Sequence, residues 1–335
     1  MCFHFCRCSV SLLGRRRSWL VLAAFVALFF AAAGVSASEA NPGAAGEPAA
    51  PAISDAVLVR GIYVSQPTLE SPKKLDHLIQ SSLEVGVNTF VVDLWVPSSR
   101  YVKTIERLTK FGIRYVPRIT VFPHGGSPEQ IRSQRYWESR WKLVDYALKL
   151  GAKDIQLDYI RYRSRNDASP KNAADILKVI QFFQKRIHER GARLQIDIFG
   201  EAAHAPSLHI GQDMGLFASS IDGVCPMVYP SHYQPYAKRA KIPYKTVRDS
   251  LEALKVQLGT QPVKIYAYIE LWNHRYRLEL GERVNYVREE LRAVSDAKVH
   301  GFYAWSASNK YDLLFEILKR FPDKVLTAKA VEARL

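Results

Sequence analysis

The residues best suited to chemistry lie in the stretch from Asp154 to Arg163, which alternates apolar and polar residues before an acid, an aromatic and two arginines. An amphipathic segment and Gly151 precede this stretch, as a helix and its terminating glycine precede a strand. Side chains alternate along a strand, so Gln156 and Asp158 share one face. We therefore predict that Asp158 ends a strand and points into the mouth of a barrel.

Further acidic, basic and aromatic residues mark the carboxyl ends of the neighbouring expected strands. Buried carboxylates cost free energy unless they are paired or functional, so several carboxylates at one barrel mouth predict a functional site. The candidate site residues are Asp93, Trp95, Arg118, Asp158, Arg161, Asp197, Glu201, Met227, Tyr229, His232, Glu270 and Trp305.

Paired carboxylates beside aromatic residues are the groups that glycoside hydrolysis requires. One carboxylic acid protonates the leaving oxygen, and the other attacks the sugar or activates water. We predict Asp158 as the acid, which burial or a like-charged neighbour would keep protonated near pH 7. Its partner is Asp197 on the next strand or Glu270 across the mouth, and the spacing does not choose between them.

The other candidates are expected to bind the substrate. Arg118 and Arg161 would hold anionic sugar groups or orient the acids, and the aromatic side chains would stack on sugar rings. Structural roles compete with these predictions. Asp197 can simply pair with Arg161, and Trp95 and Trp305 can fill the barrel.

No metal centre or cofactor is predicted. The histidines near the strand ends lack the tight spacing of HxH or HExxH motifs. These histidines are His124, His204, His209 and His232. Cys225 lies within an expected strand and is interpreted as a buried, inert thiol. It is the only cysteine after residue 37, so no intramolecular disulfide is expected.

The elements that must position these residues repeat from residue 57 onward as strand, loop and amphipathic helix. The predicted strands are 58–64, 88–95, 113–120, a fourth that begins at 154, 193–199, 221–229, 263–270 and 299–305. The predicted helices are 71–84, 100–111, 128–150, 172–189, 244–258, 283–295 and 313–320. Eight strands that alternate with helices over about 270 residues match a single (β/α)₈ TIM barrel.

A doubly wound open sheet is the competing α/β fold. It would normally carry a Gly-rich phosphate-binding turn after its first strand. Here the residues after that strand are Ser65-Gln-Pro-Thr68, and no Walker loop or GxGxxG motif occurs at a strand–helix junction. The sequence therefore favours the barrel.

The amino terminus has the order of a secretory signal peptide: basic residues, an apolar run and a small-residue cleavage site. These parts are Arg15–Arg17, Trp19–Val35 and Val35-Ser-Ala37. We predict a signal peptide over 1–37, a disordered Ala/Pro/Gly linker over 38–54, a barrel over 55–325 and a tail over 326–335. The chain would be periplasmic or extracellular, or anchored in a membrane if the segment stays uncleaved.

The chain has 335 residues, a formal net charge of +15, and 48% apolar and 24% charged residues. This composition is typical of a folded protein and excludes a disordered one. The basic excess favours an anionic polysaccharide or another acidic partner, although a solubility charge spread over helix faces explains it equally well. Nucleic acid is not expected as a partner, since an exported protein rarely meets it. We expect a monomer.

Five motifs lie at or just beyond the expected strand ends. They are Leu157-Asp-Tyr-Ile-Arg161, Asp197-Ile-Phe-Gly200, Ile210-Gly-Gln-Asp213, Pro226-Met-Val-Tyr-Pro-Ser-His-Tyr233 and Gly301-Phe-Tyr-Ala-Trp305. Together they resemble the DUF4015 family of glycoside-hydrolase-like barrels, over nearly the whole chain after the linker. The resemblance implies a (β/α)₈ barrel that hydrolyses a carbohydrate.

Carried over by position, the resemblance implies that Asp158 is the strand-four acid and that Met227 and Tyr229 line the sugar subsite. Ile160 stands where chitinases have a glutamate two residues after this acid. The resemblance therefore disfavours the N-acetyl-assisted chitinase mechanism and leaves a two-carboxylate mechanism or no activity.

The sequence thus predicts a glycoside hydrolase that acts on a cell-envelope or extracellular polysaccharide or oligosaccharide. The alternatives are a non-catalytic carbohydrate-binding barrel and a metal-dependent deacetylase. Function of the binding barrel would survive replacement of Asp158 by Asn, and activity of the deacetylase would be lost to a chelator.

Overall fold

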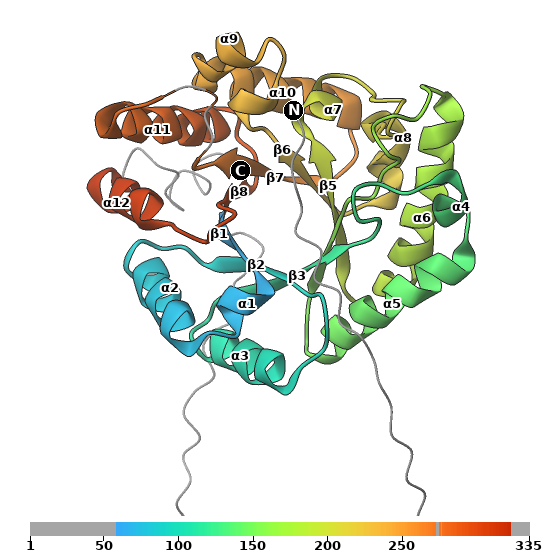
Figure 1. The fold of residues 1–335 in the computed structure, drawn as a ribbon, viewed down its shortest axis with the longest axis horizontal. Helices are drawn as coiled ribbons and strands as arrows, with labels where there is room; N and C mark the ends of the chain where they lie inside the picture. Colours follow the sequence, from blue (N-terminus) through green and yellow to red (C-terminus); the bar gives the residue numbers. More distant parts are fainter. Residues whose placement is uncertain (1–57, 273–274, 276, 323–335) are drawn as a thin grey trace, which may run out of the picture. The chain divides into compact units, whose positions relative to one another are not determined.

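Eight parallel strands close into a barrel in chain order in a computed structural model of the chain (Figure 1). The structure describes residues 58–272, 275 and 277–322, so the predicted signal peptide, linker and tail lie outside the described residues. The strands are β1 (Val59–Val64), β2 (Thr89–Asp93), β3 (Arg114–Thr120), β4 (Asp154–Asp158), β5 (Arg193–Phe199), β6 (Gly223–Met227), β7 (Lys264–Glu270) and β8 (Gly301–Trp305). β8 pairs with β1, which closes the barrel and confirms the predicted single (β/α)₈ fold.

Helices surround the barrel in Figure 1. Six of the predicted helices are present, namely α2 (Pro72–Glu84), α3 (Ser99–Lys110), α6 (Pro170–His188), α10 (Pro243–Leu258), α11 (Leu280–Asp296) and α12 (Asp312–Arg320). The loops contain short helices that the sequence did not predict. They are α1 (Gln66–Leu69), α7 (Gly200–His204), α8 (Met214–Phe217), α9 (Tyr236–Ala240), and the 3₁₀ helices η1 (Ala218–Ser220) and η2 (Pro230–His232).

The single helix predicted over 128–150 is wrong in one respect, because the structure divides it into α4 (Pro128–Ile131) and α5 (Gln134–Lys149). Ser133 has an extended backbone, and its side chain accepts a hydrogen bond from the Tyr136 backbone N–H. A serine in this geometry caps the start of a new helix. The periodic apolar pattern runs through both helices, which is why the pattern alone did not reveal the break.

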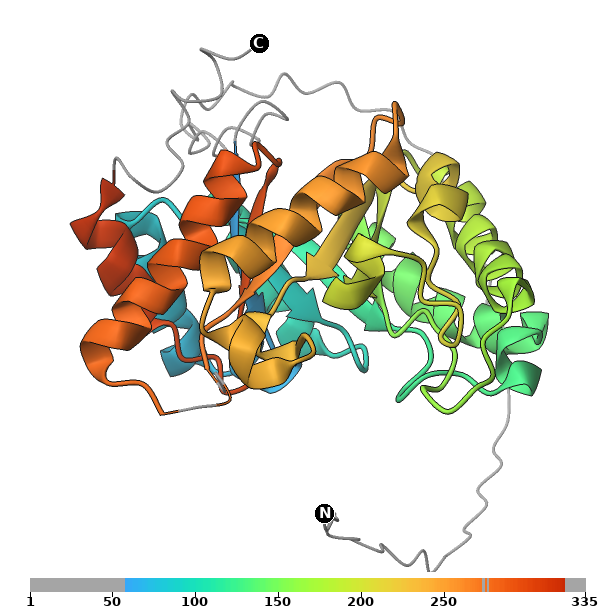
Figure 2. The same ribbon diagram turned by 90° about the horizontal axis from the view of Figure 1, so that it is seen from above.

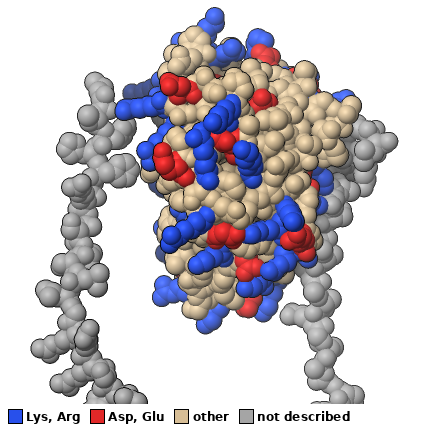
Figure 3. Space-filling view, turned by 90° about the vertical axis from the view of Figure 1, so that its right-hand side faces the viewer, with Lys and Arg blue, Asp and Glu red and all other residues tan. Residues whose placement is uncertain are grey.

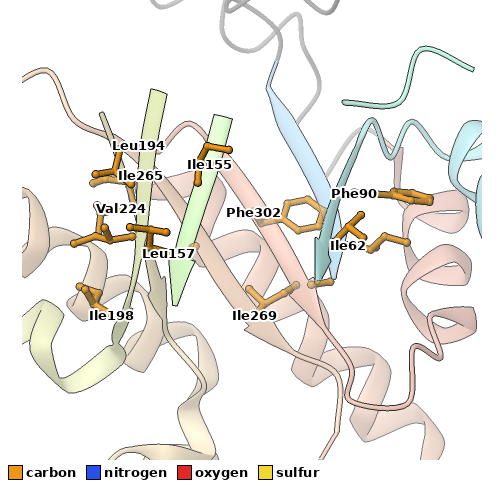
Figure 4. Packing of buried hydrophobic residues seen from close by; sticks show 14 of the residues in the cluster. Ile62, Phe90, Ile155, Leu157, Leu194, Ile198, Val224, Ile265, Ile269 and Phe302 are labelled. Carbon is orange, nitrogen blue, oxygen red and sulfur yellow. The ribbon is translucent and has the colours of Figure 1, made fainter. Parts of the chain in front are cut away.

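The outer face of the barrel is apolar and packs against the helices. Isoleucine, leucine, valine and phenylalanine side chains of the strands fill this face. Figure 4 shows buried side chains of this layer, among them Ile62, Phe90, Ile155, Leu157, Leu194, Ile198, Val224, Ile265, Ile269 and Phe302. This packing fixes which face of each strand turns inward.

The inner face of the barrel is aromatic and polar. Tyr268 Oη donates to Gln156 Oε1 at 2.8 Å, and Tyr303 Oη donates to Gln195 Oε1 at 3.1 Å. These bonds join β7 to β4 and β8 to β5, which are not neighbouring strands, so the side chains meet across the interior. Cys225 is buried beside both glutamines, as predicted for a free thiol. Because side chains alternate, the next inward residues of β4 and β5 are Asp158 and Asp197.

The outer helices carry mixed charge. α10 and α11 lie side by side outside the strands, in the orange part of the chain in Figures 1 and 2. On the face drawn in Figure 3, basic side chains are interspersed with acidic ones. Arg186, for example, pairs with Glu138 at 2.7 Å. No helix within the described residues is long and apolar enough to cross a membrane.

Candidate active site

Arg118 lies at the centre of three carboxylates at the carboxyl ends of neighbouring strands. Its guanidinium contacts Asp93 at the end of β2 and Asp158 at the end of β4. Its Nε lies 3.5 Å from Asp197 Oδ2 on β5. Burial opposes the charge of Arg118, but the three carboxylates together raise its pKa well above the ordinary value. One arginine therefore holds three acids at the barrel mouth.

Asp197 is the carboxyl group of this cluster that lacks a full set of partners. Its Oδ1 is buried and has no hydrogen-bond partner among the described residues. Burial, and then the charge of Asp158, raise the pKa of Asp197 well above its usual range, although Arg118 opposes the shift. The surroundings of Asp197 therefore favour its protonated form, since the charged form of a buried carboxyl group is disfavoured.

Asp158 is held differently from Asp197. It accepts a hydrogen bond from the Tyr159 backbone N–H in addition to its contact with Arg118. The two acids on adjacent strands thus have different partners.

A cavity of about 240 Å³ opens above these residues at the carboxyl ends of the strands. It brings together nine of the twelve predicted site residues, namely Arg118, Asp158, Arg161, Asp197, Glu201, Met227, Tyr229, His232 and Trp305. They come from β3 to β6, β8 and the loops that follow β4, β5 and β6. The cavity is therefore built by the strand ends that the barrel prediction required.

Arg161 lies in the wall of the cavity but does not pair with the acids. Its guanidinium carbon lies 5.2 Å from the centroid of the Tyr159 ring and 4.9 Å from that of Phe199. The alternative in which Asp197 simply pairs with Arg161 is therefore wrong. Arg118 contacts both acids because its strand lies beside β4 and its side chain points inward.

Aromatic rings form the opposite wall of the cavity. Tyr229 and Trp305 stack with centroids 5.6 Å apart and an interplanar angle of 25°. Trp272 lies 5.5 Å from Trp305 and is 43% exposed, and His232 lies edge-on to Tyr229 at 5.3 Å. The flat faces of such rings suit sugar rings, which present apolar C–H groups.

Glu270 is buried away from the cavity and holds the loop after β6. Its carboxylate accepts hydrogen bonds from the Ser231 backbone N–H at 2.9 Å, from Ser231 Oγ at 2.7 Å and from Tyr286 Oη at 2.7 Å. Its own backbone N–H donates to Glu290 Oε1 at 3.1 Å. These bonds tie β7 and α11 to η2, the 3₁₀ helix that contains His232.

A family model described as "Putative glycosyl hydrolase domain", DUF4015, matches residues 129–311, which is more than half of the chain. The chain belongs to the DUF4015 family. The match runs from α4 to the residue before α12 and contains Asp158, Arg161 and Asp197. It starts after β3, so it is shorter at the amino end than the resemblance predicted from the motifs.

Solved structures share the fold of the DUF4015 barrel at low identity. The spore cortex-lytic enzyme SleL from Bacillus cereus gives a TM-score of 0.55 at 12% identity, over 78% of this chain and 73% of that one. A chitinase from Chromobacterium violaceum ATCC 12472 gives 0.55 at 12% identity, over 79% and 99%. The endo-1,4-beta-mannanase from Rhizomucor miehei gives 0.60 at 11% identity, over 83% and 96%. No curated protein matches the chain in sequence.

Three predicted site residues of the DUF4015 barrel do not line the cavity. Asp93 is buried and binds Arg118 and the Tyr63 hydroxyl, so it orients the arginine. Trp95 is 55% exposed and lies in a neighbouring hollow, because β2 ends at Asp93 and the alternation stops there. Glu270 faces η2 and α11 instead of the cavity. The geometry therefore favours Asp197 over Glu270 as the partner of Asp158.

Six cavity residues were absent from the predicted site. They are Tyr159, Phe199, Gly200, Gln212, Tyr233 and Tyr268. Period two in β7 and β5 places Tyr268 and Phe199 inward, so the strand pattern contained a signal for both. Gly200 had no local signal. A Cβ atom there would lie 2.1 Å from Tyr233 Oη, so glycine is required for Tyr233 to reach the cavity.

The histidines of the DUF4015 barrel are dispersed. His204 binds the Ser250 hydroxyl at 3.0 Å, whereas His232 packs on Tyr229. Among residues 58–272, 275 and 277–322, no three His, Cys, Asp or Glu side chains are arranged to hold a metal ion. The deacetylase alternative therefore has no supporting ligand set in this part of the chain.

We predict that Glu270→Gln flattens the pH dependence of stability. Burial raises the pKa of Glu270 from 4.5 to about 7, although its three hydrogen-bond donors oppose the shift. The folded state thus binds the proton more tightly than the unfolded state, so this stability is full below pH 4.5 and is lost as the pH rises towards 7. The shift corresponds to a loss on the order of 3 kcal/mol.

Thermal unfolding of wild type and Glu270→Gln at pH 5, 6, 7 and 8 measures this effect. The melting temperature of the wild type should fall over this range relative to that of the variant. Glu106→Gln changes an exposed glutamate on α3 and should follow the wild type. Parallel curves for wild type and Glu270→Gln would show that Glu270 does not titrate there.

Proposed function

We propose that the DUF4015 barrel hydrolyses O-glycosidic bonds of a polysaccharide through Asp158 and Asp197. The observation that carries the proposal is the placement of these two acids on adjacent strand ends in one cavity, with different partners: Asp158 is paired with Arg118, and the pKa of Asp197 is raised by burial. Pairs of carboxyl groups whose environments differ in this way are what acid/base chemistry at a glycosidic bond needs. The aromatic wall of Tyr229 and Trp305 supports a sugar ligand.

The environments support a division of roles opposite to the one predicted from sequence. The pKa of Asp197 is raised by burial, and its Oδ1 has no partner among the described residues, so it suits the general acid. Asp158 is paired with Arg118 and suits the charged carboxylate. In this reaction Asp197 gives its proton to the leaving oxygen as the bond between that oxygen and the anomeric carbon breaks. Asp158 attacks that carbon directly or takes a proton from the water that attacks it.

The amino-terminal sequence supports export, so we propose that the substrate belongs to the cell envelope or lies outside the cell. Arg15–Arg17 and the apolar run Trp19–Val35 are the features that support it. Recovery of the chain from the periplasm or the medium, with Ser38 as its first residue, would agree with cleavage. Recovery only from the cytoplasm would contradict export.

The test of the function is the release of new reducing ends by the purified chain from neutral, amino and acidic polysaccharides. We expect release from at least one class of polymer. A non-catalytic carbohydrate-binding barrel is the second candidate, and the direct pairing of Asp158 with Arg118 is the observation that favours it. Binding of a polysaccharide without any release would support that candidate and contradict hydrolysis.

A further inference from the structure

The two arginines of the cavity are used in different ways. Arg118 is surrounded by three carboxylates, whereas Arg161 forms no ion pair with any described residue. Among the described residues, the Arg161 side chain makes one hydrogen bond, from Nη1 to the Tyr162 carbonyl at 2.8 Å. A guanidinium carries five N–H donors, so most of its hydrogen-bonding capacity remains available in the cavity wall.

The chain holds the Arg161 guanidinium in one place. Tyr159 and Phe199 both contact it with their rings, and Tyr159 adopts a left-handed backbone conformation with φ of 53°. Gly125 lies against it on another side. A Cβ atom at Gly125, where φ is +88°, would lie 2.8 Å from Arg161 Nη1 and 2.6 Å from the Tyr162 carbonyl oxygen. Glycine is therefore needed for the loop to approach this closely, and the site is built around the arginine.

The positive charge of Arg161 is buried without an acidic partner among the described residues. Arg161 is only 7% exposed, and a buried charge is costly unless it is paired. The two rings stabilise the cation in part through their π faces. Burial nevertheless lowers the pKa of Arg161, and the charge of Asp158 does not offset this effect. A negatively charged group that enters the cavity would stabilise this cation.

We propose that Arg161 binds a carboxylate of a sugar unit next to the cleaved bond, so that the substrate is an acidic polysaccharide. This inference rests on the proposed function, since Arg161 and Asp158 line the same cavity. A planar guanidinium pairs with a carboxylate through two parallel N–H···O bonds, a geometry that a lysine cannot provide. The net charge of +15 favours the approach of a polyanion.

The acids of the cavity leave room for a further negative charge. Asp158 is paired with Arg118, and burial favours the protonated form of Asp197. Glu201 also lines the cavity, but its side chain is exposed, where solvent and salt screen its repulsion. Each of these features reduces the repulsion that a carboxylate beside Arg161 would meet.

Equilibrium binding of four probes tests the proposal. Two carry carboxylates from different sources: an oligogalacturonide, with carboxylates on the ring, and peptide-free peptidoglycan strands, with lactyl carboxylates. The other two are the same molecules after reduction of the carboxylates to alcohols. We expect the wild type to bind at least one acidic probe about 10-fold or more tightly than its reduced form, as hydrogen bonds to charged groups imply.

Arg161→Gln should remove this preference, because glutamine keeps polar atoms but has no charge. Arg163→Gln changes an exposed arginine of the same loop and should keep the wild-type preference. Arg161→Lys keeps the charge but lacks the planar guanidinium. It should therefore keep only part of the preference for the acidic probe. Melting temperatures of the variants close to that of the wild type ensure that a loss of binding is not a loss of folding.

Several results would overturn the inference. They are no binding of either acidic probe, equal binding of acidic and reduced probes, or an unchanged preference in Arg161→Gln. Binding needs no turnover, and mass spectrometry shows whether a probe stays intact. Carboxylate-dependent binding without cleavage would support the anion site and contradict hydrolysis, whereas cleavage of neutral polymers alone would support hydrolysis and contradict the anion site.

Discussion

Asp158→Asn and Asp197→Asn should each lower kcat/KM for glycosidic bond cleavage by at least about 10²-fold, the usual effect of removing a general acid or base. Asparagine has nearly the size of aspartate but can neither donate this proton nor attack the anomeric carbon. Because both acids line one cavity, neither can replace the other without moving. Initial rates of reducing-end release on the polymer that the wild type degrades measure the loss.

The two variants should differ in their dependence on the leaving group. An aryl glycoside with an acidic phenol leaves without protonation, so Asp197→Asn should regain much of its rate on it. Asp158→Asn should stay slow, since attack on the sugar or activation of water is still required. The pKa of Asp197 is raised, so the wild-type rate should fall as the pH rises through that pKa, and this limb should be absent in Asp197→Asn.

Asp167→Asn is the matched control, because it changes an exposed acid in the loop between β4 and α6. It should keep the wild-type rate. Full activity of Asp158→Asn with a normal melting temperature would contradict the catalytic role and leave a carbohydrate-binding barrel. The opposite pattern, in which only Asp158→Asn is rescued by the good leaving group, would restore the roles predicted from sequence.

The sequence was sufficient for the fold because the signals that define a (β/α)₈ barrel are local. Each strand is a short β-branched run, and each long helix has an apolar face and a boundary residue such as Gly86 or Gly112. The predicted starts of all eight strands lie within two residues of the observed starts. The short helices in the loops were missed because segments of three to five residues are too short to show helical periodicity.

Part of the site was also predicted from the local pattern of the strands. Period two along β4 and β5 places Asp158 and Asp197 inward, and the barrel places both at one end. The same rule gave a wrong prediction for Glu270. Its position in the alternation is that of an inward residue, but its carboxylate accepts hydrogen bonds from Ser231 and Tyr286. Those partners lie on a loop and a helix, and the strand pattern does not predict where these two segments pack. Contacts between distant segments decide such cases.

Arg118 also makes contacts between distant segments, because it binds acids on three other strands. Its replacement should destabilise the fold strongly. Arg118→Met keeps much of the length of the side chain but leaves Asp93, Asp158 and Asp197 without their common cation. Breaking a buried ion pair from one side typically costs about 3–5 kcal/mol, because the remaining charges stay buried without a partner. We expect a loss in this range in urea unfolding at pH 7.

The loss in the free energy of unfolding should depend on pH. This dependence distinguishes the loss of an ion pair from a packing defect. In the variant, the buried carboxylates can only be accommodated by binding protons, so lowering the pH from 7 towards 4 should reduce the difference from the wild type. A packing defect would give the same difference in unfolding free energy from the wild type at pH 7 and at pH 4. Arg163→Met removes an exposed cation and should cost little at either pH, since exposed charges contribute about 1 kcal/mol at most. A pH-independent loss in Arg118→Met would mean that the three acids do not depend on this arginine, and it would contradict the role of Arg118 as the common partner of Asp158 and Asp197.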